Sequence, residues 1–207
     1  MGEGVTICVV DDDRSVRLAI RSLLESVGMA VEDFASAEDF LDYAADESVG
    51  CLVLDVRMPG IGGLDLFQIL GERGRNIPVV FVTGHGDVPM SVRAMKQGAI
   101  DFLQKPFNEQ ELLDAVGKAL EEGRARSEVR QRAEAVEARI ASLTPRELEV
   151  MKLIVEGYSN REVGRVLGAA ENTIKIHRAR VMKKMEAGSL PELVRLAAVS
   201  AGPGSSG

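Results

Sequence analysis

Short apolar runs alternate with amphipathic segments along the first half of the chain. Runs of consecutive apolar residues, typical of buried strands, occur at Val5–Val10, Cys51–Leu54, Pro78–Val82 and Ile100–Leu103, with a weaker run at Ala30–Phe34. Between these runs, helical periodicity covers Val16–Val27, Ala37–Ala45, Leu64–Leu70, Val88–Gln97 and Glu109–Leu120. Strands that alternate with helices favour an α/β fold, with a doubly wound five-stranded parallel sheet over residues 1–121.

The pattern changes to helix alone after residue 121. Charged residues alternate with alanine over residues 122–140, which predicts an exposed helical linker. Four apolar residues follow one another at 4-3-4 spacing and could form a dimer seam: Val129, Ala133, Val136 and Ile140. The preceding positions of that register are Arg126 and Glu122, and Gly123 weakens the helix. A solvated spacer is therefore favoured over a coiled coil, which needs about three to four heptads.

The last third of the chain predicts a compact all-α domain over residues 141–201. Helix starts at Thr144, Ser159 and Ser189 carry capping-box spacing, because each of these residues is followed three positions later by Glu. Gly157 and Gly168 separate the helices between them. Residues 202–207 are rich in Gly and Ser, which predicts a disordered tail.

Charge distinguishes the two halves. Residues 1–121 hold 21 Asp and Glu against 10 Lys and Arg, whereas residues 141–207 hold 7 against 10, which suggests different partners. No apolar run approaches the roughly 18 residues of a membrane span, and no secretory signal begins the sequence. Cys8 and Cys51 lie within apolar runs. These features predict a cytoplasmic protein with buried reduced thiols and no membrane partner.

Chemically active side chains follow four of the predicted strands. Asp11-Asp12-Asp13 follows the first strand, Asp55 follows the run at 51–54, and Thr83 and Lys105 follow the last two. Parallel strands bring such positions to one edge of a sheet, where clustered carboxylates call for a hard divalent cation such as Mg²⁺. A carboxylate beside Mg²⁺, a hydroxyl and an ammonium group is the set that phosphoryl transfer to aspartate requires.

Four stretches make this half similar to a known family. They are VVDDD at 9–13, LDVRMPGIGG at 54–63, VTGHGDV at 82–88 and DFLQKPF at 101–107. Together they resemble the receiver domain of bacterial response regulators, which has a flavodoxin-like fold. The resemblance implies that Asp55 accepts a phosphoryl group and that Asp12 binds Mg²⁺ directly. It also implies that Asp11 acts largely through water and that the backbone carbonyl of Arg57 joins Asp55 as a metal ligand.

The same resemblance implies roles around the phosphoryl group. Thr83 and Lys105 are expected to bind its oxygens, and the Lys105–Pro106 peptide is expected to be cis. Phe102 is expected to be the aromatic that rotates with Thr83 as a switch, with an ordinary core phenylalanine as the alternative. Asp13 is predicted from its position alone to cap the helix that follows.

A predicted helix from about Glu171 to Lys184 has two faces. One face carries Ile174, Val181 and Met185, which predicts packing against a core. The opposite face offers cations and a small apolar patch to base edges, through Lys175, Ile176, Ala179, Arg180 and Lys183. Thr173, near the helix start, is expected to bind a phosphate. A solvated basic face is the alternative for an isolated charge run.

Residues 143–200 are similar to the LuxR/NarL-type helix-turn-helix domain, through the stretch LTPRELEVMKLIVEGYSNREVGRVLGAAENTIKIHRARVMKKM. The resemblance implies four stacked helices, the third of which enters the major groove of DNA. Arg178 lies toward the core side, so pairing with Glu147 and contact with DNA both stay open, and His177 is interpreted as structural. Ala169-Ala170 precede the third helix, and the missing Ser or Thr cap costs about 1 kcal/mol.

The two resemblances together predict a two-domain response regulator of the FixJ/StyR/TodT-like subgroup. The subgroup is suggested by TGHGDVP followed by AMKQGAIDFLQKPF, and by the helical linker. A sensor histidine kinase is expected to phosphorylate Asp55, and phosphorylation is expected to drive homodimer formation and control sequence-specific DNA binding. RNA polymerase is the further partner expected of such a transcription regulator.

Two other classes of protein stay open. A haloacid-dehalogenase-type phosphatase would carry its nucleophile directly after the first strand, whereas Asp55 here is separate from the acids at 11–13. A DNA-binding or scaffold protein that does not use phosphorylation would not need the complete set of Asp11, Asp12, Asp55, Thr83 and Lys105. The chain is therefore expected to be a regulator and not an enzyme.

Overall fold

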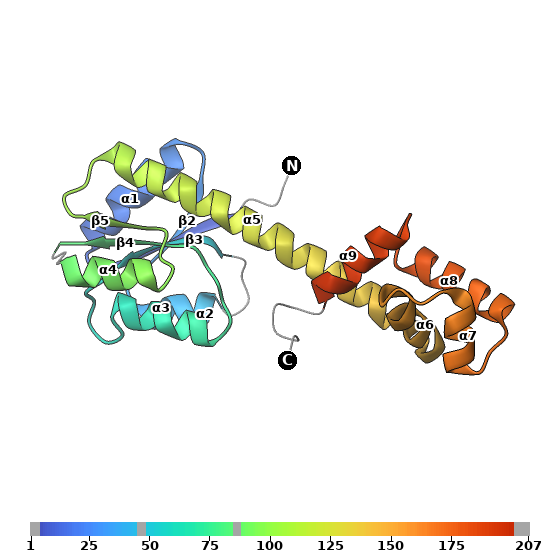
Figure 1. The fold of residues 1–207 in the computed structure, drawn as a ribbon. Coiled ribbons are helices and arrows are strands. Elements are labelled where there is room, and N and C mark those ends of the chain that lie inside the picture. The colour runs from blue at the N-terminus through green and yellow to red at the C-terminus, as the bar shows by residue number, and fades with distance from the viewer. Residues whose placement is uncertain (1–4, 45–48, 85–87, 201–207) are drawn as a thin grey trace. The chain divides into compact units, whose positions relative to one another are not determined.

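The computed structural model describes residues 5–44, 49–84 and 88–200. Contacts between residues divide the chain into two compact units, Met1–Arg126 and Ser127–Gly207 (Figure 1). The division falls inside the predicted linker, and the individual limits of the predicted domains stay a prediction. The predicted tail at 202–207 lies outside the described residues.

The first unit contains a five-stranded sheet with the strand order β2-β1-β3-β4-β5. The strands are β1 (Thr6–Val10), β2 (Ala30–Phe34), β3 (Val49–Asp55), β4 (Val79–Thr83) and β5 (Asp101–Gln104). Every neighbouring pair of strands is parallel, which confirms the predicted doubly wound α/β fold. Because the strand order reverses direction at β1 and β3, the edge where these two strands end is the expected place for a site.

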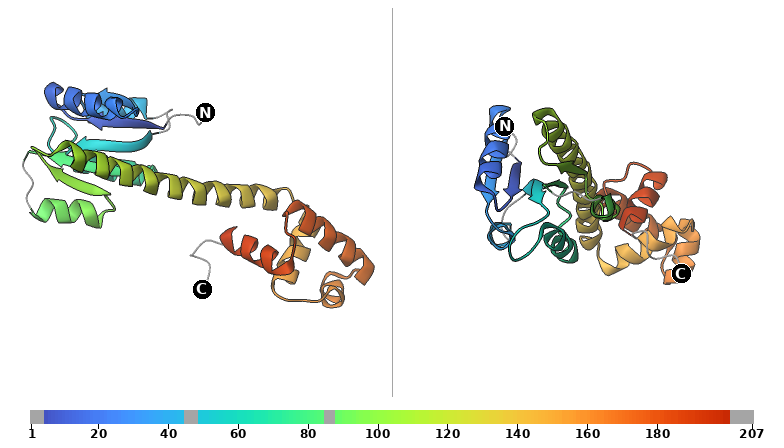
Figure 2. Two further views of the ribbon diagram at one scale, coloured as in Figure 1. Left: turned by 90° about the horizontal axis from the view of Figure 1, so that it is seen from above. Right: turned by 90° about the vertical axis from the view of Figure 1, so that its left-hand side faces the viewer.

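Helices cover both faces of this sheet. They are α1 (Arg14–Ser26), α2 (Ala37–Tyr43), α3 (Gly63–Glu72), α4 (Val88–Lys96) and α5 (Glu109–Ala141). The first part of α5 lies with α1 on one face, whereas α2, α3 and α4 lie on the other (Figures 1 and 2). Alternate residues of β1 show the two layers, because Ile7 and Val9 pack with α1 and α5, and Cys8 and Val10 pack with the other helices.

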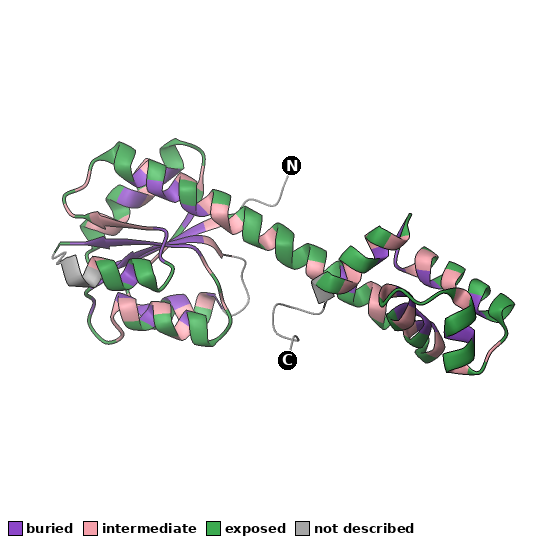
Figure 3. Ribbon diagram, in the orientation of Figure 1, coloured by how far each residue is buried: buried purple, intermediate pink, exposed green. Residues whose placement is uncertain are grey.

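Burial on both faces explains the continuous apolar runs of the strands. The middle of the sheet is buried along its length (Figure 3). Cys8 and Cys51 are free, buried thiols, as predicted. Burial raises the pKa of each thiol to about 12, so neither is a nucleophile near neutral pH.

Helix α5 is one continuous helix of 33 residues, which confirms the predicted helical continuation through 122–140. Gly123 does not interrupt it. A Cβ atom at Gly123 would lie 3.0 Å from Cγ of Pro78 and 3.2 Å from the carbonyl oxygen of Gly50. Glycine therefore allows a close approach here, and α5 still packs on the first unit beyond residue 121.

The second unit packs the end of α5 with four helices of the described chain, as the all-α prediction requires. These are α6 (Pro145–Val155), α7 (Asn160–Leu167), α8 (Glu171–Lys184) and α9 (Leu190–Ser200). Val136 of α5 is 4% exposed in the core of this unit and Ile140 packs against it, whereas Val129 is 66% exposed. Packing within one chain thus accounts for the last two residues of the 4-3-4 pattern.

The predicted capping boxes set the helix starts of the second unit. Thr144 and Ser159 form complete boxes, in which the side chain of each cap and the glutamate three residues later exchange hydrogen bonds with the backbone. The third box is altered at Ser189, because the Glu192 carboxylate accepts from the backbone amide of Gly188, at 2.8 Å.

Gly63 and Gly71 of α3 provide a matched pair for testing close packing. A Cβ atom at Gly63 would lie 2.1 Å from the carbonyl oxygen of Asp55, whereas one at Gly71 would meet nothing within 4 Å. We expect Gly63→Ala to destabilise the fold by about 1–3 kcal/mol, because backbone must move. We expect Gly71→Ala to stabilise it by up to about 1 kcal/mol, as in other helix interiors. Urea unfolding followed by circular dichroism measures both, and equal effects would contradict the close approach.

Candidate functional site

The carboxyl ends of β1, β3 and β5 bring three predicted site residues into contact. Lys105 Nζ lies 2.5 Å from Oδ2 of Asp11 and 2.9 Å from Oδ1 of Asp55. Asp11 is completely buried and Asp55 is 5% exposed. One ammonium group therefore bridges two buried carboxylates that come from different strands.

The charges of this cluster are set by burial and by the bridge. Burial raises the pKa of Asp55, and the hydrogen bond from Lys105 opposes that shift. Burial also works against the charged form of Lys105, but its hydrogen bonds and its charge attraction to Asp11 and Asp55 together outweigh burial and raise its pKa. The backbone amide of Arg57 donates to Oδ2 of Asp55 at 2.8 Å. Both oxygens of the Asp55 carboxylate are thus held by donors.

The three successive acids after β1 have different surroundings. Asp11 points into the cluster, and its Oδ1 accepts from the backbone amide of Asp13 at 2.9 Å. Asp13 caps α1 by accepting from the amide of Ser15 at 2.8 Å, which confirms the predicted cap. The Asp12 side chain is exposed. The structure therefore places Asp11, and not Asp12, in contact with Lys105 and beside Asp55.

The donor set fits a magnesium ion that keeps much of its water. Within the described ranges, no three His, Cys, Asp or Glu side chains are grouped to hold a metal. Mg²⁺ is usually bound by one or two carboxylates and several waters, so Asp11 and Asp55 with the Arg57 carbonyl suit it, and Asp12 stands exposed beside them. The division of metal roles between Asp11 and Asp12 stays a prediction.

Thr83 and Phe102 lie on the neighbouring strands β4 and β5. Thr83 is 1% exposed at the end of β4, and its carbonyl oxygen accepts from the Lys105 amide at 2.8 Å. Phe102 is half-buried, with its ring centroid 6.3 Å from that of Phe81. The Lys105–Pro106 peptide is cis, as expected. The structure brings the Thr83 and Lys105 backbones together, and the switch role of Thr83 and Phe102 stays a prediction.

The second candidate site is the exposed face of α8. The helix has the predicted bounds, and Ile174, Val181 and Met185 are completely buried, as expected. The opposite face is exposed, with Thr173, Lys175, Ile176, Ala179, Arg180 and Lys183. Ala170, the N-cap residue before α8, makes no side-chain hydrogen bond to the helix, which confirms the weak cap predicted there. This surface presents cations around an isoleucine that is 50% exposed.

Two charged contacts of α8 were not predicted from the sequence. Arg178 donates to Oδ1 of Asn160 at 3.2 Å, so of the two alternatives left open for it, pairing with Glu147 is wrong. Lys184 takes that place, with its Nζ 2.7 Å from Oε2 of Glu147 and 2.9 Å from the carbonyl oxygen of Ser142. Periodicity contains a signal for this pair, because residue 184 follows Val181 by three positions and therefore lies near the buried face.

Arg139 is a second contact that sequence reasoning missed. This residue of α5 donates to the carbonyl oxygen of Met185 at 3.4 Å and to the Glu186 carboxylate at 2.5 Å. Arg139 thus ties the carboxyl end of α8 to the last turns of α5, and Lys184 ties it to Ser142 and to Glu147 of α6. His177 is partly buried, and its Nδ1 atom has no hydrogen-bond partner among the described residues.

Both units match known families. The model of the response regulator receiver domain matches residues 7–117, and that of the bacterial regulatory proteins of the luxR family matches residues 141–197. Nodulation protein W of Bradyrhizobium diazoefficiens is 48% identical over 190 residues, which cover 92% of this chain and 84% of that protein. The transcriptional regulatory protein FixJ of Azorhizobium caulinodans is 47% identical, over 95% of this chain and 93% of that protein.

Solved structures agree with these matches. The structure of the response regulator StyR is 46% identical with a TM-score of 0.86, covering 95% of this chain and 99% of that one. The structure of full-length FixJ from B. japonicum is 42% identical with a TM-score of 0.58, covering 95% and 97%. No helix in the described part of the chain is long and apolar enough to cross a membrane.

The Glu147–Lys184 pair predicts a pH-dependent stability of the second unit. The hydrogen bond from Lys184, with that from the Thr144 amide, lowers the pKa of Glu147 from 4.5 to about 2. The stabilisation is therefore complete above about pH 4.5 and is lost as the pH falls toward 2. We expect Glu147→Gln to be less stable at pH 7 and to show a flatter decline of stability below pH 4.5.

Tyrosine fluorescence during urea unfolding can follow this unit. The chain has two tyrosines and no tryptophan, so Tyr43→Phe leaves Tyr158 as its sole reporter. Glu149→Gln in the same background is the control, since Glu149 is exposed and pairs with Arg146 on the surface of α6. The same acid profile in Glu147→Gln and in the parent would disprove the assignment.

Proposed function

Because the chain belongs to the response regulators that join a receiver domain to a LuxR-type DNA-binding domain, we propose that phosphorylation of Asp55 controls its binding to DNA. The observation that carries this proposal is the Lys105 ammonium bridging Asp11 and Asp55 at the carboxyl edge of the sheet. A relative named as a transcriptional regulator supports a regulatory and not an enzymatic role. The phosphatase alternative therefore loses its support.

The proposed chemistry is transfer of a phosphoryl group to a carboxylate. A carboxylate oxygen of Asp55 attacks phosphorus in line, the new O–P bond forms, and the bond from phosphorus to the donor nitrogen of a phosphohistidine breaks. Asp11, Asp12, Asp55 and the Arg57 carbonyl would hold Mg²⁺, which would neutralise charge at the phosphoryl oxygens.

The chain's own groups act on the same oxygens. Lys105, which already contacts Asp55, follows the charge as it moves from the carboxylate to the phosphoryl group. The Thr83 hydroxyl binds a phosphoryl oxygen, and Phe102 moves with Thr83 to report the modification. The half-buried position of Phe102 beside the buried Phe81 supports this, because its ring is not fully enclosed.

The proposed partners follow from the two domains. A sensor histidine kinase donates the phosphoryl group in the cytoplasm, the phosphorylated chains form a homodimer, and the bound dimer acts on RNA polymerase. The receiver domain and the luxR-family domain that the chain matches support the kinase and DNA partners.

The exposed face of α8 is proposed to read DNA in the major groove. On this face, the exposed side chains of Lys175, Ile176 and Arg180 would meet base edges, and those of Thr173 and Lys183 would meet phosphates. Lys175 lies 3.4 Å from Glu171 on the same helix, and both side chains are about half exposed. Such a surface pair is weak, so DNA can displace it.

Asp55→Asn tests the acceptor. The substitution removes the nucleophile and keeps the side-chain volume, so the protein should fold and fail to accept a phosphoryl group. Incubation with acetyl phosphate and Mg²⁺, followed by intact-mass spectrometry, should add one phosphoryl group to the wild type. Asp65→Asn of α3 is the control and should be labelled normally. Full labelling of Asp55→Asn would refute the assignment.

Alanine substitutions on α8 test the DNA interface. Lys175→Ala, Ile176→Ala and Arg180→Ala should each weaken binding to a selected operator by about 1–3 kcal/mol and relax selectivity at one position. Lys183→Ala should weaken all sequences similarly and lower the salt slope by about one unit. Fluorescence anisotropy on operator and scrambled duplexes, at several salt concentrations, measures both effects with and without phosphorylation.

The charge-matched control for this series is Lys152→Ala. Lys152 is an exposed residue of α6, so its loss changes net charge without altering α8. It should change affinity for the operator and the scrambled duplex by the same small factor. Unchanged selectivity in both Lys175→Ala and Ile176→Ala, with folding confirmed by circular dichroism, would show that α8 is not the reading helix.

A further inference from the structure

Arg17 of α1 is bonded to the backbone of the acidic loop at residues 11–13. Its Nη1 atom donates to the carbonyl oxygen of Asp11 at 2.6 Å and to that of Asp12 at 3.2 Å. The Arg17 side chain is only 12% exposed. One guanidinium nitrogen thus holds the main chain of two successive residues, both of which belong to the proposed metal site.

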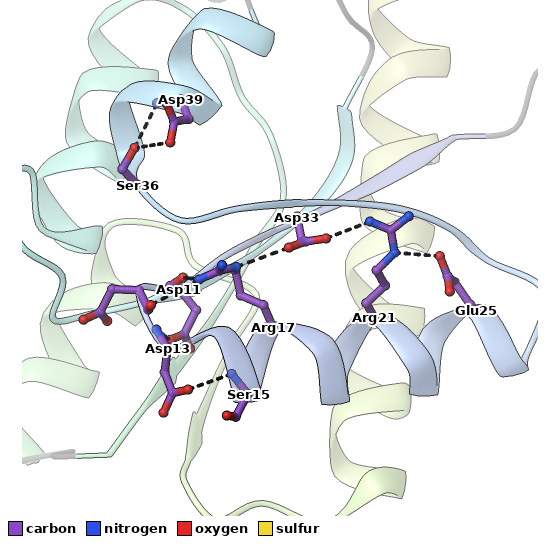
Figure 4. A network of polar contacts seen from close by, with 10 residues as sticks. Asp11, Asp13, Ser15, Arg17, Arg21, Glu25, Asp33, Ser36 and Asp39 are labelled. Atoms are coloured by element: carbon purple, nitrogen blue, oxygen red, sulfur yellow. Dashed lines mark hydrogen bonds and ion pairs between the residues drawn. The ribbon is translucent and has the colours of Figure 1, made fainter.

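The same guanidinium is fixed from its other side by β2. Its Nε atom donates to Oδ2 of Asp33 at 3.2 Å, and Oδ1 of Asp33 accepts from Arg21 at 2.7 Å. Figure 4 shows Arg17 joined to the loop at one end and to Asp33 at the other. Hydrogen bonds from Arg21 and from Arg17 lower the pKa of Asp33, so it remains a carboxylate at neutral pH. Arg17 therefore has little freedom to leave the loop.

We propose that Arg17 is a positioning residue, which holds the loop backbone so that the Asp11 side chain faces Asp55 and the exposed Asp12 side chain leaves the backbone in a fixed direction. This inference rests on the proposed function. Three successive carboxylates and Asp55 repel one another, and the repulsion favours conformations of the loop that spread them apart. Because Arg17 binds the carbonyl oxygens of Asp11 and Asp12, it fixes the two peptide planes that link residues 11, 12 and 13. The orientation of these planes determines the direction in which the side chains leave the backbone.

The geometry requires arginine and not merely a positive charge. Separate nitrogens of one planar group reach the loop carbonyls and the Asp33 carboxylate at the same time. A lysine ammonium is a single point with a different reach, so it can hold one of these partners but not reproduce the fork. Arg17→Lys should therefore behave like Arg17→Gln, although it keeps the charge.

The test uses full-length protein with Arg17→Gln, Arg17→Lys and the control Arg21→Gln. Arg21 binds Asp33 and Glu25 and contacts neither loop carbonyl through its assigned hydrogen bonds. Isothermal titration with Mg²⁺ should show about a tenfold or greater loss of affinity in both Arg17 variants, the range expected when the support of a ligand is removed. Arg21→Gln should stay within about twofold of wild type.

A second readout needs no metal and no phosphorylation. The Asp13 amide donates to Asp11 Oδ1, so its hydrogen exchange in metal-free protein reports the orientation of the Asp11 side chain. This exchange should accelerate at least tenfold in the Arg17 variants and not in Arg21→Gln, while protection of the β3 amides stays unchanged. A general loss of stability would instead accelerate exchange in β3 as well.

The outcomes separate this inference from the proposed function. The positioning role would be overturned if Arg17→Gln bound Mg²⁺ with wild-type affinity and its Asp13 amide exchanged at the wild-type rate. It would also be overturned if Arg17→Lys restored both quantities fully. Failure of wild type to bind Mg²⁺ or to accept a phosphoryl group would overturn the proposed function, whereas the exchange result would still decide whether Arg17 orients Asp11. If Arg17→Gln does not fold, Asp33→Asn loosens the same guanidinium, and it should give an intermediate loss in both readouts.

Discussion

The ion pairs that Lys105 makes with Asp11 and Asp55 are the constraint on which the first unit depends. Two carboxylates with almost no exposure cannot remain charged side by side without a cation. The cation comes from the loop after β5, so β1, β3 and β5 must all end at the same edge with their positions correct. A parallel sheet with the order β2-β1-β3-β4-β5 satisfies that requirement, and its helices then bury both faces. The strand order that forms the fold is therefore also what brings the residues of the site together.

Much of this arrangement is predictable because it depends on patterns within short segments. Continuous apolar runs locate the ends of four strands to within two residues. The runs are continuous because helices cover both faces of the sheet, so that successive residues of a strand are all buried. Polar residues directly after those runs locate the acidic cluster. The faces of α8 follow from a period of 3.6 residues, and the boxes at Thr144 and Ser159 follow from capping chemistry.

The features that sequence reasoning missed depend on contacts between distant segments. Periodicity places Arg178 and Lys184 near the buried side of α8, but only packing decides that Lys184 reaches Glu147 and that Arg178 reaches Asn160. Three acids in a row give no sign that the first is enclosed and the second exposed. Gly123 weakens an isolated helix, and its close approach to Pro78 emerges only once the sheet is formed. In the sequence, Arg17 likewise cannot be distinguished from an exposed arginine, because its partner Asp33 lies on β2 and meets it only in the folded protein.

Helix α5 gives buried side chains to both cores, from Leu112 and Val116 in the first unit to Val136 in the second. A domain exchange between related proteins is therefore not a matter of cutting at the ends of the two family matches. A junction at residue 121 would take Gly123 from one parent protein and its packing partners Gly50 and Pro78 from the other. A junction at residue 141 would likewise take Val136 and the core that it fills from different parents. Recombination should preserve both cores only where the joint lies between residues 124 and 135. Within this segment of α5, each core keeps the helix residues that fill it, whichever parent supplies the other core.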